Sequence, residues 1–211
     1  MKERFWQKRW QDNEIPFHEG QVNALLQTHF EKLALSKGSR IFLPLCGKTR
    51  DIAWLLAQDM KVVGAELSEL AINALFSELA LQPKITQQGE LTLYQAQNIE
   101  IYVGDIFKVT KNMLGGIDAV YDRAALVALP EVMRKQYASH LMSISANAPQ
   151  LLITFEYDQS VMPGPPFSIS PNEVSTHYEG CFKLNAIDKK DVEGGLKGKV
   201  SATENAWLLN K

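Results

Sequence analysis

Gly47 and Glu66 are the residues whose types and spacing first indicate chemistry. Gly47 lies in a turn after the apolar run 41–45, and Glu66 ends the next apolar run, 61–66. Such a turn lets a ligand approach the backbone closely, and a carboxylate at the end of the following strand accepts hydrogen bonds from ribose hydroxyls. The separation of 66 − 47 = 19 residues fits the roughly 20 residues expected for that acid. The pattern therefore predicts a βαβ unit that binds a nucleotide, with Glu66 on its ribose.

The turn lacks the repeated glycines of a dinucleotide site. Pro44 stands where the first of those glycines is expected, and Gly47 is the glycine that remains. Repeated glycines let backbone N–H groups surround a pyrophosphate at a helix N-terminus. We therefore expect a nucleotide-like ligand that is not held by a pyrophosphate cradle.

Two further groups of residues follow predicted strands. Asp105 and Ile106 come after the run 99–103, and Asp122 and Arg123 come after the run 116–121. Because ligands of open α/β sheets bind at the carboxyl ends of the strands, these residues are candidates for the same site. For Asp105 the alternative is a loop carboxylate that caps the next turn. For Arg123 the alternative is an ion pair with Asp122 or another acid, and both roles can hold together.

Strand and helix patterns alternate through the chain and must position these residues. Apolar runs predict strands at 40–45, 61–66, 99–103, 116–121 and 150–156. Helical periodicity and capping residues predict helices at 48–58, 68–80 and 130–145, with a short helix from Pro171. The polar stretch 82–98 is expected to be irregular, with a hairpin around Gly89, and 182–188 pairs with 202–209 as a closing antiparallel hairpin. The prediction is an α/β fold with a mostly parallel twisted sheet and helices on both faces.

Composition favours one soluble domain over residues 1–211, with helical residues 1–37 capping an α/β core of residues 38–211. The chain is 45% hydrophobic and 22% charged, which is ordinary for a globular protein. Its net charge of −2 leaves no basic surplus to neutralise nucleic acid phosphates. No apolar run approaches the roughly 20 residues that span a bilayer. Neither nucleic acid nor a membrane is an expected partner.

The cysteines and histidines do not form a metal-binding pattern. Cys46 and Cys181 lie far apart without a CxxC pair, and the four histidines are scattered. The N-terminus has no apolar segment of the kind found in secretory signals. We therefore expect no metal and a cytoplasmic protein with reduced thiols, in which Cys46 is a small packed side chain.

Five parts of the sequence, taken in order, resemble one known family. They are WQKRW at 6–10 with Phe17-His18, FLPLCGK at 42–48, GAELSEL at 64–70, YDRAALVAL at 121–129 and PGPPF at 163–167. From about residue 4 onward the chain is similar to the bacterial thiopurine S-methyltransferases. The resemblance implies the Rossmann-like class I methyltransferase fold and the use of S-adenosylmethionine (AdoMet). That ligand has no phosphates, which agrees with Pro44 in the turn. A monomer is expected because nothing in the sequence demands more than one chain.

The resemblance also implies roles for individual residues. Cofactor contacts are implied for Trp10, Leu45, Gly47, Glu66, Asp105, Ile106 and Arg123. Substrate contacts are implied for Phe17, Arg123, Pro165 and Phe167, and a catalytic role for Arg123 with Asp122. A guanidinium at the edge of the sheet would stabilise a thiolate electrostatically.

The reaction implied is a direct displacement, in which the sulfur of an aromatic or heterocyclic thiol attacks the AdoMet methyl group and S-adenosylhomocysteine (AdoHcy) is released. Alignment and exclusion of water would then supply most of the catalysis. Three alternatives stay open: methylation of selenium, tellurium, oxygen or nitrogen, a non-catalytic AdoMet-binding module, and an NAD-dependent reductase. Neither the physiological acceptor nor the need for a general base follows from the sequence.

Overall fold

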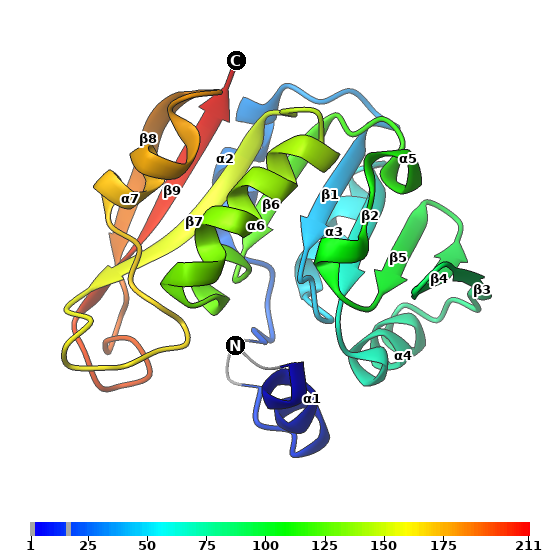
Figure 1. The fold of residues 1–211 in the computed structure, drawn as a ribbon, viewed down its shortest axis with the longest axis horizontal. Helices are drawn as coiled ribbons and strands as arrows, with labels where there is room; N and C mark the ends of the chain where they lie inside the picture. The colour runs from blue at the N-terminus through cyan, green and yellow to red at the C-terminus, as the bar shows by residue number, and fades with distance from the viewer. Residues whose placement is uncertain (1–2, 16–17) are drawn as a thin grey trace.

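The computed structural model describes residues 3–15 and 18–211, and within them the strands form one nine-stranded sheet (Figure 1). Its strand order is β3-β4-β5-β2-β1-β6-β7-β9-β8. The strands are β1 (Arg40–Pro44), β2 (Lys61–Glu66), β3 (Lys84–Gln88), β4 (Leu91–Ala96), β5 (Ile99–Val103), β6 (Ala119–Arg123), β7 (Gln150–Tyr157), β8 (Lys183–Asp191) and β9 (Ala202–Asn210). The central strands β5, β2, β1, β6 and β7 are parallel, and both edges are antiparallel. The predicted α/β sheet is confirmed.

Helices cover both faces of the sheet, and the two core clusters show which helix lies on which face. α2 (Ala24–His29), α3 (Arg50–Ala57) and α4 (Glu69–Glu78) pack on one face. α5 (Lys111–Leu114), α6 (Glu131–Ile144) and α7 (Pro171–Tyr178) pack on the other. α1 (Glu3–Gln11) lies apart from both faces, beyond the carboxyl ends of the parallel strands (Figure 1). Of the predicted helical cap, residues 1–37, α1 lies beyond the carboxyl ends of the parallel strands (Figure 1), whereas α2 packs on a face of the sheet as part of the core.

Polar side chains begin the helices where the sequence predicts. Ser68 precedes α4 and accepts the backbone N–H of Ala71 at 3.3 Å. Ser170 precedes α7 and accepts the N–H of Glu173 at 3.2 Å, with Pro171 at the first helical position. Each cap pairs a donor that the first helical turn would otherwise leave unpaired. These caps fix the residues at which α4 and α7 begin.

Two segments differ from the sequence-based expectation, and a third adds to it. The hairpin predicted around Gly89 is confirmed, but the stretch 82–98 is not irregular, because β3 and β4 form a regular antiparallel pair that extends the sheet. β6 continues to Arg123, so that Asp122 and Arg123 lie within the strand and do not follow it. The closing hairpin is antiparallel as predicted; the sequence left open which of its strands lies inside the sheet, and in the structure β9 pairs with β7. No helix in the described part of the chain is long and apolar enough to cross a membrane.

Candidate functional site

The strand order reverses between β1 and β6, and a large cavity opens at the carboxyl ends of the strands there. In open α/β sheets this reversal is where ligands bind, because the connections on the two sides diverge. The cavity has a volume of about 870 Å³. Its lining comes from α1, from the ends of β1, β2, β5 and β6, and from the loop between β8 and β9. The residues include Trp6, Trp10, His18, Glu19, Leu45, Gly47, Glu66, Asp105, Ile106, Arg123, Phe155, Pro165, Lys197 and Glu204.

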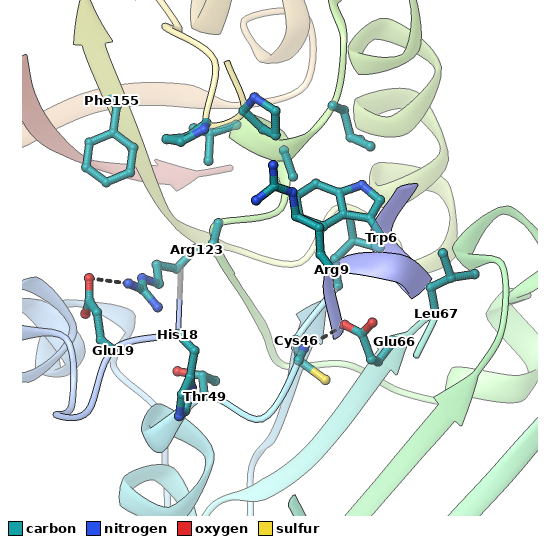
Figure 2. A pocket seen from close by; sticks show the side chains of 18 of the residues that line it. Trp6, Arg9, His18, Glu19, Cys46, Thr49, Glu66, Leu67, Arg123 and Phe155 are labelled. Carbon is teal, nitrogen blue, oxygen red and sulfur yellow. Dashed lines mark hydrogen bonds and ion pairs between the residues drawn. The ribbon is translucent and has the colours of Figure 1, made fainter. Parts of the chain in front are cut away.

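Glu66 connects the two turns at the carboxyl ends of β1 and β2. Its Oε2 accepts the backbone N–H of Gly47 at 2.7 Å, which is the dashed line at Glu66 in Figure 2. Its Oε1 accepts the backbone N–H of Ser68 at 2.8 Å. The side chain is almost completely buried, and that burial raises the pKa of Glu66, while the backbone hydrogen bonds oppose the shift. A carboxylate offers about four lone-pair sites, so two remain for a ligand. The predicted spacing of Gly47 and Glu66 therefore becomes a direct contact.

Gly47 also allows α1 to approach the turn. A Cβ atom at this position would lie 3.1 Å from Cζ2 of Trp10, and the backbone φ of Gly47 is +53°. That φ favours glycine because a side chain is strained in the left-handed region. Trp10 is 7% exposed and lines the cavity with Trp6 and Arg9 of the same helix (Figure 2). The turn and α1 thus form one wall.

Asp105 and Ile106 lie where the sequence predicts, at the carboxyl end of β5. Oδ1 of Asp105 accepts the backbone N–H of Phe107 at 3.0 Å, so this carboxylate caps the following turn. Asp105 and Ile106 both line the cavity. The capping alternative is therefore observed, and its geometry leaves the second carboxylate oxygen available to a ligand.

Arg123 forms an ion pair with Glu19, which the sequence did not single out. Figure 2 shows the two side chains pointing toward one another inside the cavity. The Arg123 side chain is 8% exposed. Burial disfavours its charge, but Glu19 and neighbouring groups outweigh burial and raise the pKa of Arg123. The alternative of an ion pair with another acid is thus observed, and Asp122 is not the partner.

Asp122 does not line the cavity, which corrects the prediction that it acts beside Arg123. Successive side chains of a strand point to opposite faces, so Arg123 and Asp122 diverge. Asp122 is completely buried, where it accepts the Tyr137 hydroxyl at 2.6 Å and the Leu126 N–H at 3.1 Å. Burial raises the pKa of Asp122 to about 6. Its contacts fix the end of β6 against α6.

The predicted substrate residues do not all meet in the cavity. Pro165 lines it, but Phe167 is absent from the lining, and its ring lies 5.8 Å from the guanidinium carbon of Arg134. Phe17 lies outside the described residues.

Cys46 is buried, as expected for a packed side chain. In the described part of the chain, no three His, Cys, Asp or Glu residues are grouped so as to hold a metal ion.

After Glu19, Glu204 of β9 is another carboxylate of the lining that sequence reasoning missed. Its Oε1 accepts the side-chain amide of Asn23 at 3.3 Å. The signal available in the sequence was an acid placed within the apolar run 202–209, since a charged side chain is rarely placed inside a buried strand without a partner.

The chain is similar to known proteins in both sequence and fold. The family model described as thiopurine S-methyltransferase matches residues 1–210. Proteins named thiopurine S-methyltransferase from Xanthobacter autotrophicus and Teredinibacter turnerae are 51% and 49% identical to the chain; the alignments cover all of this chain and 100% and 98% of theirs.

Among solved structures, the 1,6-didemethyltoxoflavin-N1-methyltransferase of Burkholderia thailandensis has a TM-score of 0.66 at 13% identity, covering 99% of this chain and 87% of that one. The magnesium protoporphyrin IX methyltransferase of Synechocystis has a TM-score of 0.63 at 13% identity and covers both chains completely. Both structures contain bound S-adenosylhomocysteine. At this identity they establish the shared Rossmann-like fold.

Proposed function

The chain belongs to the thiopurine S-methyltransferase family, and from that premise we propose that it transfers the AdoMet methyl group to the sulfur of aromatic and heterocyclic thiols. The observation that carries the proposal is that one cavity of about 870 Å³ contains both the Glu66 carboxylate and the Arg123 guanidinium. The first group suits a ribose, and the second suits an anionic sulfur. One cavity can therefore hold the cofactor and the acceptor side by side.

The residues present fit AdoMet. Glu66 is fixed by two backbone donors and has free lone pairs for the two ribose hydroxyls. Asp105 and Ile106 would hold the adenine, with the Asp105 carboxylate accepting from its exocyclic amine. Leu45 and Trp10 would enclose the remaining part of the cofactor. When bound, AdoMet supplies a methyl group on a positively charged sulfur.

The chain's own residues would contribute to catalysis by aligning the acceptor, by excluding water and by stabilising negative charge. Apolar side chains of the lining, among them Phe155, Val127 and Pro165, suit the flat face of an aromatic acceptor. The buried guanidinium of Arg123 would attract the thiolate, since charge interactions strengthen where water is excluded. Glu19 shares that guanidinium in the absence of an acceptor. The acceptor sulfur would then attack the methyl group in line with the bond that breaks.

The test is to identify the product. The protein is incubated with AdoMet that carries a deuterated methyl group and with a panel of thiols, a selenol, a phenol and an amine, and mass spectrometry locates the label. We expect labelled thioethers from aromatic thiols. Label on the phenol or amine alone would move the reaction to oxygen or nitrogen. Tight AdoHcy binding with no labelled product would support a non-catalytic binding module.

We also propose that the enzyme acts as a monomer in the cytoplasm. Its cysteines, the buried Cys46 and the exposed Cys181, are both free thiols, as is usual where thiols are kept reduced. Light scattering on the eluting peak of a sizing column would measure the oligomeric state.

A further inference from the structure

Glu204 lies in the cavity wall beside the ring that an aromatic acceptor would contact. In the antiparallel register of β7 and β9, Glu204 is paired with Phe155, and both residues line the cavity. Directly opposed residues of antiparallel strands lie about 4.5–5.5 Å apart at Cβ and share a face. The carboxylate is thus placed next to the surface that suits the acceptor.

Three carboxyl groups act electrostatically on the guanidinium of Arg123 in this part of the described structure: Glu19, Asp51 and Glu204. Glu19 takes the ion pair with Arg123. Asp51 is completely buried and accepts a backbone N–H of Asn23 at 2.8 Å and the hydroxyl of a tyrosine at 3.0 Å. Glu204 accepts a neutral amide at 3.3 Å. Of the three acids, Glu204 has the weakest hydrogen-bonding support for its negative charge.

We propose that Glu204 accepts the proton of a neutral acceptor thiol during methyl transfer. This inference rests on the proposed function. The S–H bond breaks as an O–H bond forms on Glu204, and the electron pair of the sulfur forms the new bond to the methyl group. The bond between the methyl group and the AdoMet sulfur breaks, and its electron pair stays on the AdoHcy sulfur. The carboxyl proton then leaves to water.

The electrostatic surroundings of Glu204 support this role. Burial raises the pKa of Glu204, the charges of Glu19 and Asp51 add to that rise, and Arg123 and the Asn23 amide oppose it. A base is most effective when its pKa approaches the working pH. Once the proton has left, Arg123 stabilises the thiolate that remains. Tyr121, which donates to Asp51, is a further titratable group near this set.

The test compares two acceptors that differ in acidity. 4-Nitrothiophenol is ionised at neutral pH and needs no base, whereas phenylmethanethiol, an alkyl thiol, remains largely protonated. For Glu204→Gln, kcat/KM for phenylmethanethiol should fall by about 100-fold, at the lower end of general-base effects. For 4-nitrothiophenol it should change by less than about threefold. Glutamine keeps an oxygen for the Asn23 amide, so the packing should survive.

Two further variants make the result specific. Glu204→Asp restores a carboxylate and should recover part of the phenylmethanethiol rate. Glu156→Gln removes the neighbouring acid of β7, which pairs with the exposed Lys189 and does not line the cavity; it should match the wild type on both thiols. In the wild type the phenylmethanethiol rate should fall toward acidic pH as Glu204 becomes protonated, and Glu204→Gln should lack that limb. Circular dichroism verifies that each variant is folded.

The outcomes separate this proposal from the function on which it rests. Equal losses on both thiols, together with weaker AdoHcy binding, would show that Glu204 positions the cofactor and would overturn the proton role. Unchanged rates on both thiols would overturn it as well. If the wild-type enzyme fails to methylate even 4-nitrothiophenol, the proposed function is wrong, and the role of Glu204 fails with it.

Discussion

Replacing Glu66 by glutamine should weaken both cofactor binding and the fold, because this one carboxylate connects two turns and is the proposed ligand of the ribose. Its two oxygens accept backbone N–H groups of Gly47 and Ser68 at 2.7 and 2.8 Å. A glutamine side chain has one oxygen and one NH₂ group, so one of those two donors would face another donor. Glu66→Gln keeps the volume of the side chain and removes the charge, and is therefore a sharper change than Glu66→Ala.

The expected magnitude follows from the number of hydrogen bonds affected. A buried donor without an acceptor costs about 1–3 kcal/mol, so we expect a loss of about 2 kcal/mol in the free energy of unfolding. For a chain of this size that corresponds to a fall of about 4–8 °C in the unfolding midpoint. Two hydrogen bonds from ribose hydroxyls would also change from a charged to a neutral acceptor, losing about 1 kcal/mol each. Together they correspond to roughly 30-fold weaker AdoHcy binding.

The assays are calorimetric titration with AdoHcy and thermal unfolding followed by circular dichroism. Glu179→Gln is the matched control, because Glu179 is an exposed glutamate at the end of α7 and should leave both measurements unchanged. An AdoHcy dissociation constant within about twofold of the wild type would refute the ribose role of Glu66. An unchanged unfolding midpoint would refute the argument that Glu66 connects the two turns.

Three further predictions concern other parts of the site. Gly47→Ala would place a Cβ 3.1 Å from Trp10 at a φ of +53°. We therefore expect the free energy of unfolding to fall by about 1 kcal/mol or more and AdoHcy to bind more weakly, and tryptophan fluorescence would measure both. Arg123→Ala should lower the turnover of anionic thiols more than that of neutral ones; a rate that stays unchanged across the titration of a thiolate substrate would contradict the electrostatic role. Asp122 has a pKa of about 6 when folded, raised by burial from 3.8, so the folded state binds its proton more tightly. The free energy of unfolding of the wild type should therefore decrease as the pH is raised from about 4 to about 6. This group alone should account for about 3 kcal/mol, since each pKa unit corresponds to about 1.36 kcal/mol. Asp122→Asn should lack that fall in urea unfolding at the two pH values, and an equal slope in both proteins would disprove it.

The sequence was sufficient to predict the bounds of strands that are continuous apolar runs and are buried in the sheet. β2 has the predicted bounds, Lys61–Glu66, because every residue after Lys61 is buried and the acid marks the sheet edge. The order of β8 and β9 was harder to predict, because both can form the same hairpin. Composition did contain a clue: residues 183–191 are rich in charge, as edge strands often are, whereas residues 206–209 of β9 are apolar and buried.

The site was predictable where its residues are close in sequence. Gly47 and Glu66 belong to one βαβ unit, and their contact follows from that unit. Asp122 was wrongly assigned to the cavity because β6 runs two residues further than its apolar residues indicate, and the alternation of side chains then directs Asp122 into the core. Glu19 and Glu204 are separated by 204 − 19 = 185 residues, so only the folded chain places them around Arg123.

The position of β9 inside the sheet has a consequence for the order in which the protein matures. β7 pairs with β6 on one side, but its neighbour on the other side comes only from residues 202–210, which the ribosome makes after β8. Until then the chain exposes an unpaired strand edge on β7, of the kind that chaperones shield and that other chains can join. The same late segment supplies Glu204. A nascent chain can therefore complete the turns around Glu66 early in synthesis, but it acquires the Glu204 wall of the cavity only after β8 has been made.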